Sequence, residues 1–113
     1  MKEIKIQPSL AGEPELREAI QRATPWLERA IGEPANSVKA VWDLKQDEGG
    51  RKGLELTLED WTGSVSSFYA PDELNSERQA YRRFYRQWGD LLQQYTRRQV
   101  ERLRAEAAQS GKE

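Results

Sequence analysis

The first third of the chain shows two different spacings of hydrophobic and polar residues. Residues 2–7 alternate briefly and stop at Pro8, which predicts a short edge strand. From about residue 14 to Gly32, apolar residues recur at helical spacing. Pro25 interrupts this amphipathic segment, so the pattern predicts either one kinked helix or two short helices that face the same core.

The middle of the chain alternates as strands of an antiparallel sheet with one covered face. Residues 38–44 and 54–59 each place apolar side chains at every second position, and apart from Val41 the residues between them are polar. A turn near Gly49-Gly50 joins them as a hairpin. We expect Lys45 to pair with Glu55, because that register keeps both apolar faces on one side and sets opposite charges across the strands.

A second turn follows at residues 60–63. Asp60 and Gly63 suit a type I turn followed by a bulge, which pairs Asp60 with Ser64. In that register Phe68 joins the core, and the apolar side chains exposed on the opposite face are Val41, Val65 and Tyr69. These three residues form a candidate contact surface. Trp61 at the turn tip either folds back over the sheet edge or contacts a partner.

A long helix follows Pro71, with Asp72 or Ser76 as its cap. One helical face is densely apolar as far as Tyr95, through Leu74, Tyr81, Phe84, Tyr85, Trp88, Leu91 and Leu92. A domain of this length is about 35 Å across, and residues 72–95 alone span about 36 Å as helix. Residues 96–108 therefore have no core to pack on, and we expect them to project or fray.

These elements predict one α+β domain over residues 1–108, with a disordered tail over 109–113. The order is β-α-β-β-β-α, with an antiparallel, mostly meander sheet covered on one face by two helices, of which the last is long and projecting. The position of strand 2–7 in the sheet stays open.

The composition narrows the function classes. The 113 residues include no cysteine and no histidine, so we expect no disulfide, no thiolate metal site and no histidine-based catalysis. No glycine-rich phosphate loop or nucleophile motif is present, so we name no catalytic residue, no metal ligand and no cofactor. No apolar run is long enough to span a membrane and no signal-peptide core follows Met1, so we expect a cytoplasmic, non-enzymatic protein.

Charge separates the two ends of the chain only mildly. Residues 1–70 carry 9 basic and 12 acidic side chains, and residues 71–113 carry 9 basic and 7 acidic ones. The last helix is rich in arginine, which leaves nucleic-acid binding as an alternative function. However, Arg86 with Asp90, Arg97 with Glu101 and Arg102 with Glu106 have the four-residue spacing of ion pairs on a solvated helix.

We therefore expect an interaction or adaptor module that acts through its last helix, its open sheet face, or both. Val100, Leu103 and Ala107 form a narrow apolar ridge on the projecting segment, suited to a groove or to a second copy of the chain. The alternative for this ridge is an exposed helix end that frays. The candidate partner-binding residues are Arg97, Arg98, Val100, Arg102, Leu103, Arg104, Val41, Val65, Tyr69 and Trp61. Partner identity, pathway and oligomeric state do not follow from the sequence.

Overall fold

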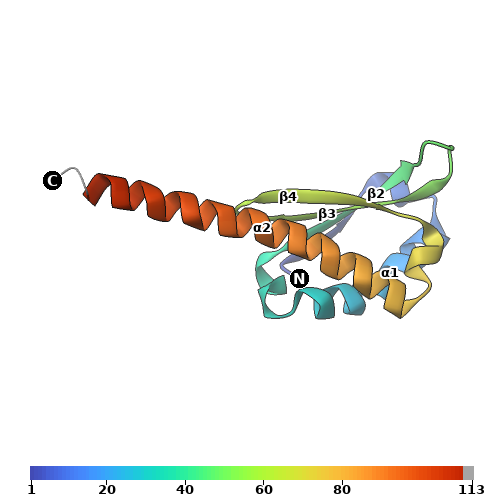
Figure 1. Cartoon of the computed structure of the whole chain (residues 1–113). Coiled ribbons are helices and arrows are strands. Elements are labelled where there is room, and N and C mark those ends of the chain that lie inside the picture. Colours follow the sequence, from blue (N-terminus) through green and yellow to red (C-terminus); the bar gives the residue numbers. More distant parts are fainter. Residues whose placement is uncertain (111–113) are drawn as a thin grey trace.

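A four-stranded mixed sheet and two helices make up the fold (Figure 1). The structure is a computed structural model, and it describes residues 1–110. The strands lie in the order β1-β2-β3-β4. The elements are β1 (Glu3–Ile6), α1 (Pro14–Ile31), β2 (Lys39–Gln46), β3 (Lys52–Asp60), β4 (Gly63–Tyr69) and α2 (Glu77–Ser110), with short 3-10 turns η1 (Pro8–Leu10), η2 (Glu33–Ser37) and η3 (Pro71–Leu74) between them.

Strand β1 corrects the expected antiparallel sheet, because it pairs in parallel with β2. The chain leaves β1, passes through α1 and re-enters the sheet beside β1 in the same direction, which is the connection that parallel neighbours need. Pro8 ends β1 after four residues, as the sequence predicted. Beyond it, Ser9 Oγ accepts a hydrogen bond from the Leu44 amide at 3.2 Å and so continues the edge of β2 where β1 stops.

The β2–β3 hairpin has a different register from the expected one. Lys45 pairs with Gly53, two residues from Glu55, although the Lys45 ammonium still reaches the Glu55 carboxylate diagonally at 2.9 Å. The turn sets this register: the Asp47 amide donates to the Arg51 carbonyl at 2.9 Å, which leaves three residues in the loop. Gly50 has φ +79°, a left-handed conformation that glycine adopts without strain. The observed register differs from the expected one by two residues. Because side chains alternate with a period of two, the apolar side chains of β2 and β3 still lie on the same face of the sheet.

The β3–β4 hairpin corrects the placement of Val65 and Tyr69. Asp60 pairs with Gly63 rather than with Ser64, so the loop is one residue shorter than expected. A shift of one residue turns every side chain of a strand to the other face. Val65 and Tyr69 therefore point into the covered face, where Tyr69 is fully buried. Phe68, expected in the core, lies instead on the open face.

Gly53 explains why Phe68 can lie on that open face. A Cβ atom at position 53 would come within 2.4 Å of the Phe68 ring, so the ring occupies the space that a side chain would fill. This close approach requires a glycine.

Helix α1 is continuous, which settles the alternative that the sequence left open. Pro25 sits inside it and is exposed, so the carbonyl that loses its partner faces water. The opposite side of α1 is buried and includes Leu16, Ile20, Ala23 and Leu27.

One hydrophobic core lies between the sheet and the two helices. Trp42, Leu54, Leu56 and Leu58 project from the strands into it, and Phe84 and Leu91 project from α2. Trp42 stacks edge-on against Phe84, with ring centroids 6.2 Å apart. Both helices therefore cover the same face, as Figure 1 shows, and the α+β class is confirmed.

Helix α2 runs well past this core (Figure 1). The molecule measures 61 × 27 × 22 Å, and its long dimension follows α2. Leu91 is the last buried residue of the helix. We call residues 96–110 the overhang; its described side chains are exposed except for Gln99, which is half-buried. The helix continues through residues 109 and 110, which the sequence analysis placed in the tail, and residues 111–113 lie outside the described part.

Candidate interaction surface

A buried polar network fixes how α2 lies on the sheet. Gln87 is only 4% exposed, and its Nε2 donates to the backbone carbonyls of Leu56 at 2.7 Å and Val65 at 3.1 Å. Its Oε1 accepts the Tyr69 hydroxyl at 2.6 Å. Burial raises the pKa of Tyr69, and the nearby Arg83 guanidinium opposes that rise. Because one glutamine satisfies three buried groups on two strands, the rotation of α2 about its axis is fixed.

That rotation leaves large apolar side chains exposed on another side of α2. Tyr85 is 60% exposed, Leu92 44%, Val100 40% and Leu103 63%. Tyr85 and Leu103 are separated by about five full helical turns, so they leave the axis in the same direction. Leu92 lies about 20° and Val100 about 60° from that direction. We call these four residues the apolar stripe; it runs from the body onto the overhang, with Gly89 and the exposed Thr96 between its members.

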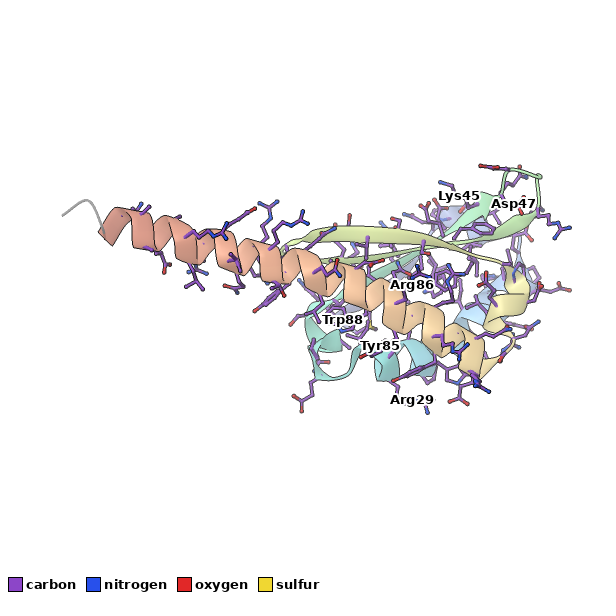
Figure 2. The ribbon with its side chains drawn as sticks, in the orientation of Figure 1. Arg29, Lys45, Asp47, Tyr85, Arg86 and Trp88 are labelled. Atoms are coloured by element: carbon purple, nitrogen blue, oxygen red, sulfur yellow. The ribbon has the colours of Figure 1, made fainter. Side chains whose placement is uncertain are left out.

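A row of arginines flanks the apolar stripe. Arg82, Arg86, Arg97 and Arg104 lie about 60–120° around the helix from Tyr85. Within residues 1–110, none of the four takes part in an ion pair. Figure 2 shows Arg86 on one side of α2 and Trp88 on the other. We call these four residues the arginine row.

The ion pairs that the sequence predicted on this helix are only partly present. Arg102 contacts Glu106 at 3.5 Å, as predicted. Glu101 instead pairs with Arg98, at 3.8 Å, which leaves Arg97 free. Charge is consequently concentrated on α2: residues 77–110 hold eight arginines and four carboxylates, a net charge of +4, whereas residues 1–76 hold 9 basic and 14 acidic side chains, a net charge of −5.

An aromatic pocket of about 420 Å³ lies on the other flank of the apolar stripe. Three parts of the chain build it: the β3–β4 turn, the η2 segment and α2. Its lining includes Trp61, Trp88, Leu92, Tyr95, Pro34 and Asp60. Trp61 is 64% exposed and stands edge-on to Tyr95, with ring centroids 5.5 Å apart. The pocket therefore sits where α2 leaves the body.

The open face of the sheet is polar. Thr57 and Ser66 hydroxyls hydrogen-bond across the strands at 2.7 Å, beside a half-buried Val41. Glu55 is held by Lys45, and Phe68 covers Gly53. This face lacks the run of exposed large apolar side chains that marks α2, so Val41 stands alone among the three residues expected there.

The seven predicted site residues on α2 and the β3–β4 turn fall into three groups. Val100, Leu103, Arg97 and Arg104 lie together on the overhang, within the apolar stripe and the arginine row. Arg98 and Arg102 lie on other sides of the helix and pair with acids of the next turn. Trp61 belongs to the aromatic pocket, where it packs edge-on against Tyr95 of α2 and stays exposed; its contact with a partner stays a prediction.

Sequence analysis missed the remaining pocket residues because it assigned Trp88, Leu92 and Tyr95 to the core face. Together with Phe84, Leu91 and Tyr85, these residues span about 120° around the helix, more than one sheet contact covers. That excess width was the available signal.

Among the described residues, no three acidic side chains gather in a way that could hold a metal ion. No helix of that part of the chain has the length and apolar character needed to cross a bilayer. The chain matches no protein-family model, no curated protein and no solved structure.

Proposed function

We propose that this chain is a non-enzymatic protein-binding module that docks a partner helix along the apolar stripe of α2. The observation that supports this most is the alignment of the stripe: the exposed Tyr85 on the body and the exposed Leu103 on the overhang point the same way, about 27 Å apart. An amphipathic helix laid along that line would cover both. Helices commonly recognise one another through such spaced apolar anchors.

The charge beside the stripe indicates which partner fits. The arginine row places four guanidinium groups along one flank. A partner helix with glutamate or aspartate on the facing flank would pair with them, and complementary charge of this kind directs both orientation and the rate of association. We therefore expect an acidic amphipathic helix.

Self-association through the same surface has less favourable electrostatics. In a two-fold antiparallel pair of α2 helices, each flank meets the same flank of the second copy. A pair centred near Thr96 would bring Arg86 of one copy close to Arg104 of the other, and the arginine row would face itself. Like charges across a contact oppose association, so we expect the isolated chain to be a monomer.

Charge-reversal variants test the docking surface. The bait is the full chain, compared with Leu103→Glu, with Arg86→Glu/Arg104→Glu, and with Arg98→Glu as a matched control on another side of α2. We expect the first two variants to lose the proteins that the unaltered chain captures and the control to retain them. Capture that survives both stripe and row variants, or that the control loses equally, contradicts the proposal.

A second candidate function, electrostatic binding of nucleic acid, is favoured by one observation: the unpaired arginines lie on a helix of net charge +4. It predicts micromolar or tighter binding of duplex RNA or DNA that weakens steeply with salt, with a slope of about −4 in log K against log salt for four phosphate contacts. Fluorescence anisotropy titrations at several salt concentrations between about 50 and 200 mM measure this slope directly. Binding that is insensitive to salt contradicts it.

A further inference from the structure

The aromatic pocket has the size and order of a ligand site. Its volume of about 420 Å³ falls in the range typical of small-molecule and side-chain pockets. Two hydrogen bonds stabilise the turn that carries Trp61. Asp60 Oδ1 accepts one from the Thr62 amide at 2.8 Å and one from the Thr62 hydroxyl. Thr62 itself is only 6% exposed. The exposed tryptophan is therefore carried on a hydrogen-bonded turn.

The charge of the pocket selects a cation. Asp60 is the only charged residue in its lining, and its second carboxylate oxygen accepts no hydrogen bond from residues 1–110. The faces of Trp61, Trp88 and Tyr95 carry negative electrostatic potential, which attracts guanidinium and ammonium groups. Asp60 adds a full negative charge beside these rings. An anionic group would be repelled, and a neutral group would gain neither interaction.

A second cavity indicates that the cation is carried on an extended chain. A cavity of about 580 Å³ adjoins the pocket on the other side of Trp61, and both share Ser37, Asp60 and Trp61. Lys2, Lys39 and Glu59 line it, so its character is polar and of mixed charge. A small free cation would use only the pocket. An extended peptide can fill both, with one side chain on each side of the Trp61 ring.

We infer that the aromatic pocket binds the arginine or lysine side chain of an extended peptide segment from a protein partner. The guanidinium or ammonium group lies against Trp61 and Trp88 and pairs with Asp60, and the peptide backbone continues into the adjoining cavity. This inference shares only Leu92 with the apolar stripe, and it does not rest on the proposed function.

Short peptides that differ only in charge test the inference. The probes are acetyl-Gly-Arg-Gly-amide and the same peptide with citrulline, a neutral isostere, in place of arginine. The readout is the indole N–H signal of each tryptophan in ¹⁵N-labelled full chain. We expect the arginine peptide to shift the Trp61 and Trp88 signals saturably, with a dissociation constant of about 1–10 mM, and to leave the buried Trp42 signal unchanged. The citrulline peptide should bind at least about threefold more weakly.

Three variants separate the pocket from the rest of α2. Asp60→Asn keeps an acceptor for Thr62 and removes the charge, so affinity should fall about three- to tenfold. Trp61→Ala should abolish the shifts at Trp88. Tyr85→Ala removes an exposed aromatic residue outside the pocket and should leave binding unchanged.

Several outcomes would overturn the inference. Equal binding of the citrulline peptide removes the charge preference, and unchanged affinity in Asp60→Asn removes the role of the carboxylate. Tighter binding of tetramethylammonium chloride than of the arginine peptide would assign the pocket to a free quaternary ammonium ion. A mass in solution that rises with concentration, and falls to the monomer in Trp61→Ala, would assign it to a second copy of the chain.

Discussion

The two halves of α2 belong to one helix but are stabilised in different ways. Before Tyr95, Ala80, Phe84, Gln87 and Leu91 are buried against the sheet and α1. In the overhang, the described side chains contact almost nothing beyond their own helix. The first half is held by tertiary packing, whereas the second depends on good helix formers and on an ion pair such as Arg102–Glu106. A helix that is already nucleated extends at little cost, so the overhang forms without stabilising the domain.

This difference explains why the apolar stripe is a candidate surface and the core face is not. In the packed half, most apolar side chains of α2 are buried or half-buried, and few are exposed. In the overhang, Val100 and Leu103 have no intramolecular partner to cover them. Substitutions on the two halves should therefore separate stability from binding.

The largest effect is expected from the core of the packed half. Phe84→Ala removes a fully buried ring that packs on Trp42 and Tyr69, so unfolding free energy should fall by about 3–5 kcal/mol. Leu103→Ala, which removes a side chain that is 63% exposed, should change it by less than about 0.5 kcal/mol. Urea unfolding of both variants measures the contrast. A comparable loss in Leu103→Ala would mean that the overhang is packed in solution.

The buried polar network should rank next. Gln87→Ala removes the acceptor of the buried Tyr69 hydroxyl and the amide that donates to the Leu56 and Val65 carbonyls, at a cost of about 1–3 kcal/mol. Gln94 is the matched control on the same helix, because its side chain is less buried and makes one long hydrogen bond within residues 1–110, 3.5 Å to the Ser64 carbonyl. Gln94→Ala should cost less than about 0.5 kcal/mol. Equal losses in the two variants would contradict a special role of Gln87.

The raised pKa of Tyr69 predicts that the free energy of unfolding of the packed body depends on pH. Its pKa is raised above the ordinary value of 10.0, so the folded state holds the phenol proton when the unfolded state has lost it. Stability from this group is complete below pH 10 and falls as pH rises through and above that value, by up to about 1.4 kcal/mol per pH unit. Urea unfolding between pH 9 and about 11 should show this slope. Tyr69→Phe should flatten it; an unchanged slope would assign it to other groups.

The smallest effect on stability should come from removing the overhang. A chain ending at Tyr95 keeps every buried residue of α2, so its unfolding free energy should match that of the full chain within about 0.5 kcal/mol. Its far-ultraviolet circular dichroism should lose the contribution of about 15 helical residues. A truncated chain that unfolds readily would show that the overhang supports the body. One that keeps every partner would end the proposal that the overhang binds.

The sequence predicted the elements better than the way they join. Apolar periodicity identified the helices and strands, because an element with one buried face shows a regular spacing of apolar residues within its own short stretch of sequence. The parallel pairing of β1 depends on the path of α1 across the sheet, which no residue in β1 encodes. The two hairpins failed at their turns: the glycine-assisted three-residue loop formed at Asp47–Arg51, whereas the sequence analysis expected it at Asp60. That single-residue error moved Val65 and Tyr69 from the candidate surface into the core.

The overhang was predictable because it follows from lengths alone, a helix of known rise beside a domain of known width. The aromatic pocket was not, because it needs the β3–β4 turn, η2 and α2 to meet. Trp61 attracted attention as a tryptophan in a turn, but its neighbours Pro34 and Tyr95 are 27 and 34 residues away along the chain.

Hydrogen exchange along α2 in the free chain tests most directly whether the overhang lacks the tertiary contacts that stabilise the first half of the helix. Amides of residues 80–91 should exchange only through global unfolding, whereas those of residues 98–108 should exchange faster by several orders of magnitude because local fraying exposes them. Uniform protection along the whole of α2, in a sample shown by its mass to be monomeric, would mean that the body stabilises the overhang and that no surface is left there for a partner.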